Sequence, residues 1–345
     1  MQSTLTKPKM LWDALDKCPI EDFPSSSDYP SRFKALADYL DRLVHPAVTV
    51  AASLKDGGLL TDHGTEHVRT VIRRASELIN NASGFELSCY ETYLLLASIH
   101  IHDIGNMSGR DGHELGSAEI VQRLGAVFGP DYVEKLMIFK IAQAHGGRIG
   151  QDKDKIAKLQ EVDHLLGMKV RPRALAALLR FSDELADDRT RAARFLLDNN
   201  KVPKSSEIFH KYAFALHSVV ISGNAIKLDF EISKADAQKV FGKYKKSVYL
   251  LDEIFERVTK MHYERIYCMR FLRPMISIDI VDVSINIYGE NFINDPIATI
   301  DFRMEEAGYP SCGKDAIFNI CPPLAEHECG APLCGESLKT YLGDK

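Results

Sequence analysis

An apolar segment that ends in an adjacent histidine and aspartate constrains this chain more than any other feature. The segment runs from Ser88 to His102 and leads directly into Asp103, Ile104 and Gly105. A helix that is apolar on all sides is buried, and a buried ionisable pair is costly unless another charge compensates it. A cation is the simplest compensation. The alternative is a helix end with a favourable histidine and a water-exposed aspartate, and the dipeptide by itself leaves both open.

Helical periodicity extends from about residue 60 to residue 198. Apolar residues from Val68 to Ile79 recur at spacings of three and four, which predicts a helix with one apolar face that ends near Asn80 and Asn81. Further helices are predicted at residues 114–128, 132–144, 155–166 and 172–186. We therefore expect an all-α domain at residues 60–200, preceded by a helical extension at residues 1–59.

The residue pattern changes after residue 200. Strands are predicted at residues 218–222 and 225–232 around a Gly-Asn turn, and at 275–288, where apolar and polar residues alternate. Ser233 is placed to cap a long helix over residues 234–270. The fold class is therefore mainly α, with a small α+β domain at residues 201–305 and a loop-like, Cys-rich tail at 306–345.

Composition and charge exclude several classes of protein. The 345 residues are 45% hydrophobic and 26% charged, which excludes collagen-like, low-complexity and wholly disordered chains. The net charge of −5 provides no basic field for nucleic acid or an anionic membrane. No apolar run approaches the roughly 18 residues of a membrane span, and the N-terminus lacks the apolar region of a secretory signal. We expect a cytoplasmic protein whose seven cysteines are reduced.

Histidines and aspartates recur at the predicted helix ends of the all-α domain, from residue 63 to residue 183. Imidazole nitrogens ligate divalent metals, carboxylates can bridge two of them, and facing helices can aim both groups inward. The candidates, in chain order, are His63, His67, His102, Asp103, His113, His145 and Asp183.

The order of these motifs resembles the HD superfamily of metal-dependent phosphohydrolases over about residues 60–190. The superfamily has an isolated histidine, then His-Asp, then a distant aspartate. These correspond to His67 in HGTEHVRTV, to His102 and Asp103 in HIHDIGN, and to Asp183 in LLRFSDELAD. The resemblance implies an all-α HD-type domain in which these four residues hold one divalent ion.

Members with two metals carry two further histidines between the His-Asp pair and the last aspartate. His113 in GHELGSAEI and His145 in AQAHGG lie in similar local sequence. The resemblance then implies that Asp103 bridges two ions and that the two histidines complete the second, while a role of His113 outside the direct ligands stays open. Manganese, iron, cobalt, nickel and zinc all suit this donor set.

Contacts to a phosphate group are less clearly marked in the sequence. Many two-metal members have lysine after His-Asp-Ile-Gly, where this chain has Asn106. Arg110 and Arg148 are the nearest substitutes, and a solvent-facing charge is the alternative for each. His63 fits a ligand, a proton shuttle, a phosphate contact or an ordinary helix-entry turn. Asp187 and Asp188 follow the last helix; either can orient Arg180 or a ligand, and the pair favours a solvated acidic patch.

The expected chemistry is hydrolysis of a phosphoester or phosphoanhydride by metal-activated water. No GxxxxGK[ST] or GxGxxG motif and no Ser-His-Asp or Cys-His spacing supports another reaction class. Asp103 and His145 are the candidate catalytic residues, with His145 as general base if one ion is bound. Family membership implies a nucleotide substrate, and hence a phosphodiesterase or pyrophosphohydrolase.

A nucleotide-sensing module that signals to a partner protein is the alternative function. The α+β domain can cover the pocket, form a homo-oligomer or contact nucleic acid, and its charge does not favour the last of these.

The tail contains the ligand types of a structural zinc site. These residues are Cys312, Cys321, His327, Cys329 and Cys334. Their spacing fits no standard zinc finger, so a structural zinc and free thiols in a loose tail both remain open.

Overall fold

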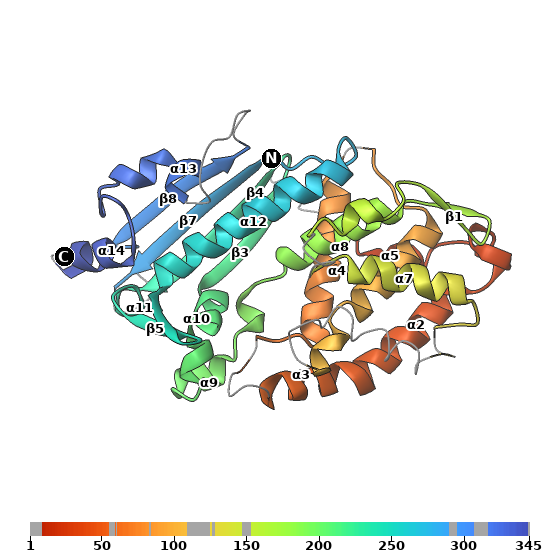
Figure 1. Ribbon diagram of the computed structural model, residues 1–345, viewed down its shortest axis with the longest axis horizontal. Coiled ribbons are helices and arrows are strands. Elements are labelled where there is room, and N and C mark those ends of the chain that lie inside the picture. The colour runs from red at the N-terminus through yellow and green to blue at the C-terminus, as the bar shows by residue number, and fades with distance from the viewer. Residues whose placement is uncertain are drawn as a thin grey trace. The chain divides into compact units, whose positions relative to one another are not determined.

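The computed structural model is mainly α with a small α+β part, as the sequence predicts (Figure 1). It describes residues 9–54, 59, 61–82, 84–108, 125, 128–146, 153–289, 295–306 and 317–343. Two compact units account for the chain. The first unit comprises Met1–Ser53, His63–Ala186 and Cys268–Ser277, and the second comprises Leu54–Asp62, Asp187–Tyr267 and Ile278–Lys345.

Helix α5 (Cys89–Ile101) is the centre of the first unit. Every residue from Tyr90 to Ile101 is buried, and the helix packs against its neighbours α1, α2, α4, α7 and α8. A capping box between Ser88 and Glu91 fixes its first turn. The neighbouring helices are α1 (Leu11–Leu15), α2 (Tyr29–Tyr39), α4 (Thr65–Asn81), α7 (Tyr132–Gln143) and α8 (Pro172–Glu184). The predicted helices at 68–81, 88–102, 132–144 and 172–186 are thus confirmed, whereas that at 114–128 lies almost wholly outside the described residues.

The helix predicted at residues 155–166 is wrong. One turn of 3-10 helix, Ile156–Lys158, is followed by a hairpin of β1 (Asp163–Leu165) and β2 (Met168–Val170). Leu166 and Gly167 form the turn with φ of 50° and 83°. Two successive residues with positive φ favour a tight hairpin, and this local turn outweighs helical spacing.

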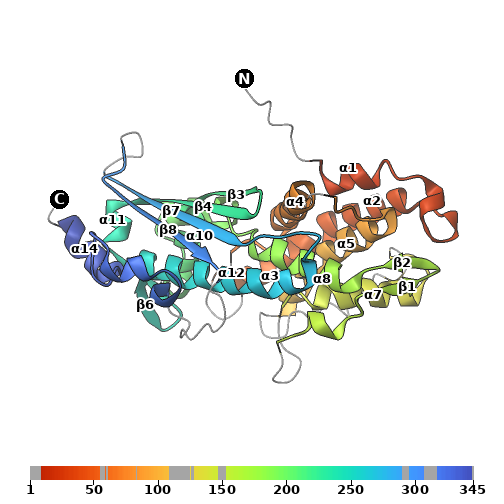
Figure 2. The same ribbon diagram turned by 90° about the horizontal axis from the view of Figure 1, so that it is seen from above.

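A four-stranded sheet with the order β3-β4-β7-β8 is the centre of the second unit. Its strands are β3 (Leu216–Ser222), β4 (Ala225–Ser233), β7 (Ile280–Tyr288) and β8 (Ala298–Glu305). The central pair β4 and β7 is parallel, with Ile226 opposite Val281, and the outer pairs are antiparallel. Helix α12 (Leu250–Leu272) runs along one face of the sheet (Figures 1 and 2). Phe255 of α12 meets Phe302 of β8 with ring centroids 5.6 Å apart.

Alternation along the strands explains which face is buried. In β7, every second residue is buried, and these are Val281, Val283, Ile285 and Ile287. Strand β8, which the sequence analysis missed, has the same alternation over eight residues. The predicted strands at 218–222, 225–232 and 275–288 are confirmed, the last of them beginning later at Ile280.

The long helix predicted at residues 234–270 is wrong over residues 238–249. Ser233 caps only the short helix α11 (Lys234–Ala237) by accepting from the backbone of Asp236. A hairpin of β5 (Val240–Lys243) and β6 (Lys246–Tyr249) follows before α12 begins. Gly242 explains the interruption, since a Cβ there would lie 1.8 Å from the carbonyl oxygen of Lys204. Close backbone packing of β5 therefore outweighs helical periodicity.

The tail is not loop-like where the structure describes it. It contains helices α13 (Ile317–Ile320) and α14 (Gly335–Gly343). Four leucines, Leu324, Leu333, Leu338 and Leu342, are at most 1% exposed. The tail therefore buries apolar side chains, although its overall composition is polar.

Cys18 and Cys89 form a disulfide between the end of α1 and the first residue of α5. This bond differs from the expectation of reduced thiols throughout the chain. No helix among the described residues has the length and apolarity needed to cross a membrane.

Candidate metal centre

His102 ends helix α5 and is oriented by the helix itself. Its Nδ1 donates to the carbonyl oxygen of Ile99 at 2.7 Å, so the lone pair is on Nε2. The residue is 1% exposed, and its Nε2 accepts no hydrogen bond within the described ranges. A buried imidazole nitrogen without a hydrogen bond is a suitable metal ligand. The chain continues through Gly105 as a 3-10 helix, Ile104–Ser108.

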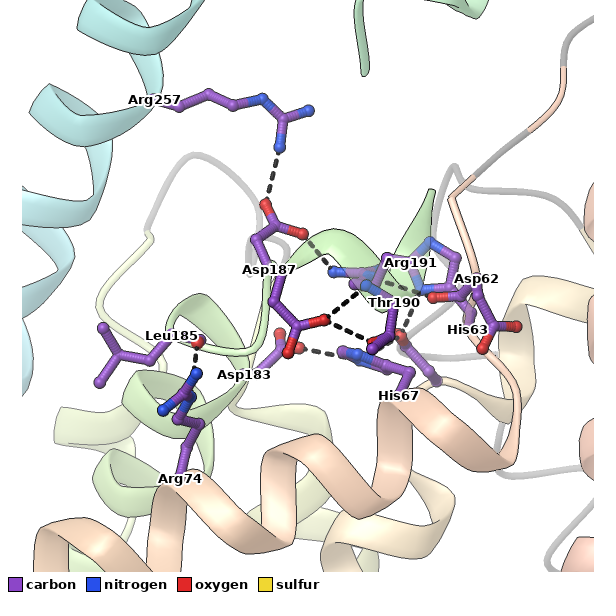
Figure 3. A network of polar contacts seen from close by, with 12 residues as sticks. Asp62, His63, His67, Arg74, Asp183, Leu185, Asp187, Thr190, Arg191 and Arg257 are labelled. Atoms are coloured by element: carbon purple, nitrogen blue, oxygen red, sulfur yellow. Dashed lines mark hydrogen bonds and ion pairs between the residues drawn. The ribbon is translucent and has the colours of Figure 1, made fainter. Parts of the chain in front are cut away.

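His67 and Asp183 approach His102 from two other helices of the unit. His67 lies in the first turn of α4, is 1% exposed, and has no hydrogen bond to either ring nitrogen among the residues described. Its Nε2 is 3.1 Å from Oδ1 of Asp183, in the last turn of α8 (Figure 3). Helices α4 and α8 pack against each other, which places these ends together.

Four side chains therefore converge, two from helices α4 and α8 and two from the residues directly after α5. The ligand atoms of His67, His102, Asp103 and Asp183 all lie within 4.8 Å of one another. Oδ2 of Asp103 is 3.5 Å from Nε2 of each of the two histidines. Two imidazoles and two carboxylates form a donor set that suits first-row divalent ions. The buried nitrogens without hydrogen bonds fit a cation at this place, and these are the four residues that the resemblance assigns to one ion.

Electrostatics in the cluster favour positive charge. Burial disfavours the imidazolium form of His102, but the carboxylates of Asp103 and Asp183 outweigh burial and raise its pKa to about 9. Burial opposes ionisation of Asp183, whereas the nearby imidazoles of His102 and His67 hold its pKa well below the ordinary value. The two carboxylates thus stabilise a positive charge at this position, whether a proton or a metal ion carries it.

Two further histidines contact Asp103 from the edge of the cluster. His63 is 8% exposed and its Nδ1 donates to Oδ2 of Asp103 at 2.7 Å. His145 follows α7, donates from Nδ1 to the carbonyl oxygen of Ala142 at 2.6 Å, and directs Nε2 to within 3.6 Å of Oδ1 of Asp103. Asp103 therefore presents one oxygen to His63 and the ligand histidines and the other to His145.

Several predicted site residues are not placed with this cluster. His113, Arg110, Arg148 and Cys312 lie outside the described residues. The described part of the chain does not gather Cys321, Cys329 and Cys334 into a ligand group. The thiol of Cys321 instead donates to the carbonyl oxygen of Arg303 at 2.9 Å. A structural zinc in the tail stays a prediction.

The structure adds a lysine near the cluster that the sequence did not single out. Lys155 is 5% exposed and donates to the carbonyl oxygen of Gly146 at 2.6 Å, directly after His145. Lys155 thereby holds the backbone directly after His145. No sequence motif marks Lys155, because this hydrogen bond joins two separate loops.

The acidic pair after α8 is not a solvated patch. In the second unit, Asp187 accepts from Arg191 at 2.6 Å and from Arg257 of α12 at 2.7 Å (Figure 3). Asp188 is 7% exposed and accepts from the backbone and hydroxyl of Thr190. Both carboxylates thus have partners inside that unit, Asp188 from the neighbouring Thr190 and Asp187 from Arg191 and the distant Arg257.

Comparison with known proteins identifies the family. A family model described as HD-CE matches residues 57–260, more than half of the chain. The chain belongs to the HD-CE family. No curated protein and no solved structure matches it. The HD-CE match includes His63 and His145 as well as the four clustered residues, and it leaves the helices before residue 57 outside.

Proposed function

We propose that this HD-CE protein is a metal-dependent phosphohydrolase that cleaves a phosphoester or phosphoanhydride bond in a nucleotide. The supporting observation is the convergence of His67, His102, Asp103 and Asp183, whose ligand atoms lie within 4.8 Å of one another. A bound divalent ion supplies Lewis acidity, which lowers the pKa of water and neutralises charge on phosphoryl oxygens.

The chain's own residues prepare the site for this chemistry. The bond from Nδ1 of His102 to the carbonyl of Ile99 keeps Nε2 directed at the two carboxylates. Asp103 has Oδ2 near His67 and His102 and Oδ1 near His145. This arrangement would suit a carboxylate shared by two ions. A second ion in this proposal uses His145 together with His113.

His145 is the proposed general base if a single ion is bound. Its Nδ1 carries the proton that is donated to the carbonyl oxygen of Ala142, so Nε2 is the nitrogen that would accept a proton, and it lies 3.6 Å from Oδ1 of Asp103. His63, Arg110 and Arg148 are the proposed contacts to the phosphate group. Preference for a nucleotide rests on the resemblance to the HD superfamily.

Turnover of a nucleotide panel tests the proposal. The full chain is incubated with Mn²⁺ or Fe²⁺ and cyclic dinucleotides, dinucleoside polyphosphates, alarmones or nucleoside triphosphates. We expect release of phosphate or mononucleotide that Asp103→Ala abolishes. His262→Gln is the matched control, because His262 is also buried, at 2% exposure, but lies in the second unit. Binding without turnover would support the nucleotide-sensing alternative and contradict the enzyme.

A further inference from the structure

The end of helix α5 needs partners for its last carbonyl groups. The final four carbonyls of a helix have no partner within the helix, and here they directly precede the ligands His102 and Asp103. His102 itself satisfies the carbonyl of Ile99. The next carbonyl, that of His100, accepts from Nε2 of His45 at 2.9 Å. Two imidazoles thus hold the last turn of α5, one of them from a segment more than 50 residues earlier.

His45 is fixed by its own contacts. It begins helix α3 (His45–Leu54), is 1% exposed, and donates from Nδ1 to Oδ1 of Asp41 at 3.0 Å. Both ring nitrogens face oxygen atoms, one of a carboxylate and one of a carbonyl, and these two contacts fix the orientation of the ring.

The carbonyl that His45 binds is held in a rigid position. The ring of His100 is 6.0 Å from that of His45 and 5.2 Å from that of Phe33. Its Nδ1 donates to the carbonyl oxygen of Leu96 at 3.0 Å. These contacts restrict movement of the His100 side chain. The backbone at His100 leads directly into His102 and Asp103, so the position of its carbonyl affects where these two residues lie.

We infer that His45 is a positioning residue for the metal centre, held by Asp41 and acting through the last turn of α5. The family match begins at residue 57, so this support comes from a part of the chain that the HD-CE model does not cover. The inference rests on the proposed function, because it assumes that the cluster binds a divalent ion.

Measurement of Mn²⁺ affinity by calorimetry on the full chain tests this inference without requiring turnover. Outer contacts of metal ligands are commonly worth about 10- to 100-fold in metal affinity, and we expect a decrease of that size for His45→Leu. His45→Gln keeps a side-chain N–H for the carbonyl of His100 and should recover most of the affinity. His210→Leu is the control, since His210 is equally buried and bonds the carbonyl of Leu59, but lies in the second unit.

Amide hydrogen exchange separates positioning from general destabilisation. His45→Leu should accelerate exchange at residues 101–106 while the amides of α4 and α8 remain protected. Asp41→Asn removes the charge that holds His45 and should give the same pattern with a smaller affinity loss, which covers the case in which His45→Leu does not fold.

Unchanged Mn²⁺ affinity in both His45→Leu and Asp41→Asn would overturn the inference, as would loss of protection spread evenly over the unit. If the wild-type chain binds Mn²⁺ but hydrolyses no nucleotide, the proposed function fails while these affinity and exchange results still decide the role of His45.

Discussion

Two buried polar clusters of the first unit use their hydrogen-bonding groups in opposite ways. Glu134 is fully buried, and its carboxylate accepts from the hydroxyls of Tyr29 and Tyr90 at 2.6 and 2.7 Å while pairing with Arg32. At the metal centre, by contrast, His67 and His102 direct nitrogens without hydrogen bonds at carboxylates, within the described residues. In the first cluster the buried carboxylate of Glu134 has its partners among neighbouring side chains, whereas the second cluster has the electrostatics and the imidazole nitrogens of a candidate cation site.

The pKa shifts reflect this difference. Burial, followed by the carboxylate of Glu134, raises the pKa of the Tyr29 and Tyr90 hydroxyls well above the ordinary value, so both remain donors. At the metal centre the carboxylates raise the pKa of His102 despite its burial. The pKa shifts around Glu134 are those of a cluster that stabilises the fold. Those of the His-Asp cluster suit a site that could bind a cation.

Removal of a ligand should have the largest effect on metal binding. Asp183→Asn removes the carboxylate that lies 3.1 Å from His67 and 3.6 Å from His102. We expect Mn²⁺ affinity to fall by more than the roughly 100-fold typical of an outer contact, with the proposed hydrolysis lost in parallel. Calorimetric titration checks this, and a variant with affinity within a few-fold of wild type would remove Asp183 from the site.

Disruption of the cluster around Glu134 should instead lower the stability of the fold. Glu134→Gln leaves the partly buried Arg32 beside a neutral side chain, and breaking an ion pair costs up to about 3–5 kcal/mol when both partners are buried. Urea denaturation should show a decrease of that order in the free energy of unfolding. Mn²⁺ affinity of the folded variant should stay at the wild-type value. A loss of affinity comparable with that of Asp183→Asn would show that the two clusters are not separate in function.

The disulfide at the start of α5 should contribute stability without affecting the ligands at its end. Cys18 and Cys89 are 71 residues apart, and closure of a loop of that length is worth up to about 4 kcal/mol in the chain-entropy model. We expect Cys89→Ser, compared with the oxidised wild type, to lose about 2–4 kcal/mol of unfolding free energy and to keep its metal affinity. Equal stability of the two proteins would show that the bond contributes nothing in solution.

A buried histidine at which burial and a neighbouring arginine outweigh the nearest carboxylate should titrate in the opposite direction from His102. In the second unit, burial and then the charge of Arg265 lower the pKa of His262 to about 4. The unfolded chain binds a proton near pH 6.5, so it binds more protons than the folded chain between these values. Stability should therefore decrease as the pH falls from about 6.5 to 4, by roughly 1–2 kcal/mol from this residue.

His262→Gln removes that contribution and should flatten the dependence of unfolding free energy on pH in this window. A variant with the same acid sensitivity as wild type would show that other groups account for it.

The sequence predicted those parts that depend on local signals. Periodicity and end signals located α4, α5, α7 and α8, and Ser88 and Pro172 fall at helix starts. The resemblance to the HD superfamily, carried by motifs on those helices, named the four residues whose ligand atoms the fold brings within 4.8 Å of one another. These residues lie in or directly after helices α4, α5 and α8, whose ends meet at the cluster.

Features that depend on long-range packing were not predictable in this way. The helix expected at 234–270 is interrupted because β5 packs closely against the backbone at Lys204. Asp187 of the expected acidic patch is instead paired with Arg257 from helix α12. His45 has no motif around it, and its role depends on a contact with the carbonyl of His100. A single sequence contains no signal for such contacts.

Metal content tests the central claim most directly. The full chain and Asp183→Asn are equilibrated by dialysis against Mn²⁺, freed of excess metal, and analysed for manganese per chain. The account predicts one or two ions per wild-type chain and a substantially lower content in the variant. A wild-type chain that retains no manganese, or a variant with the same content as wild type, would contradict the assignment of the His67, His102, Asp103 and Asp183 cluster as a metal centre.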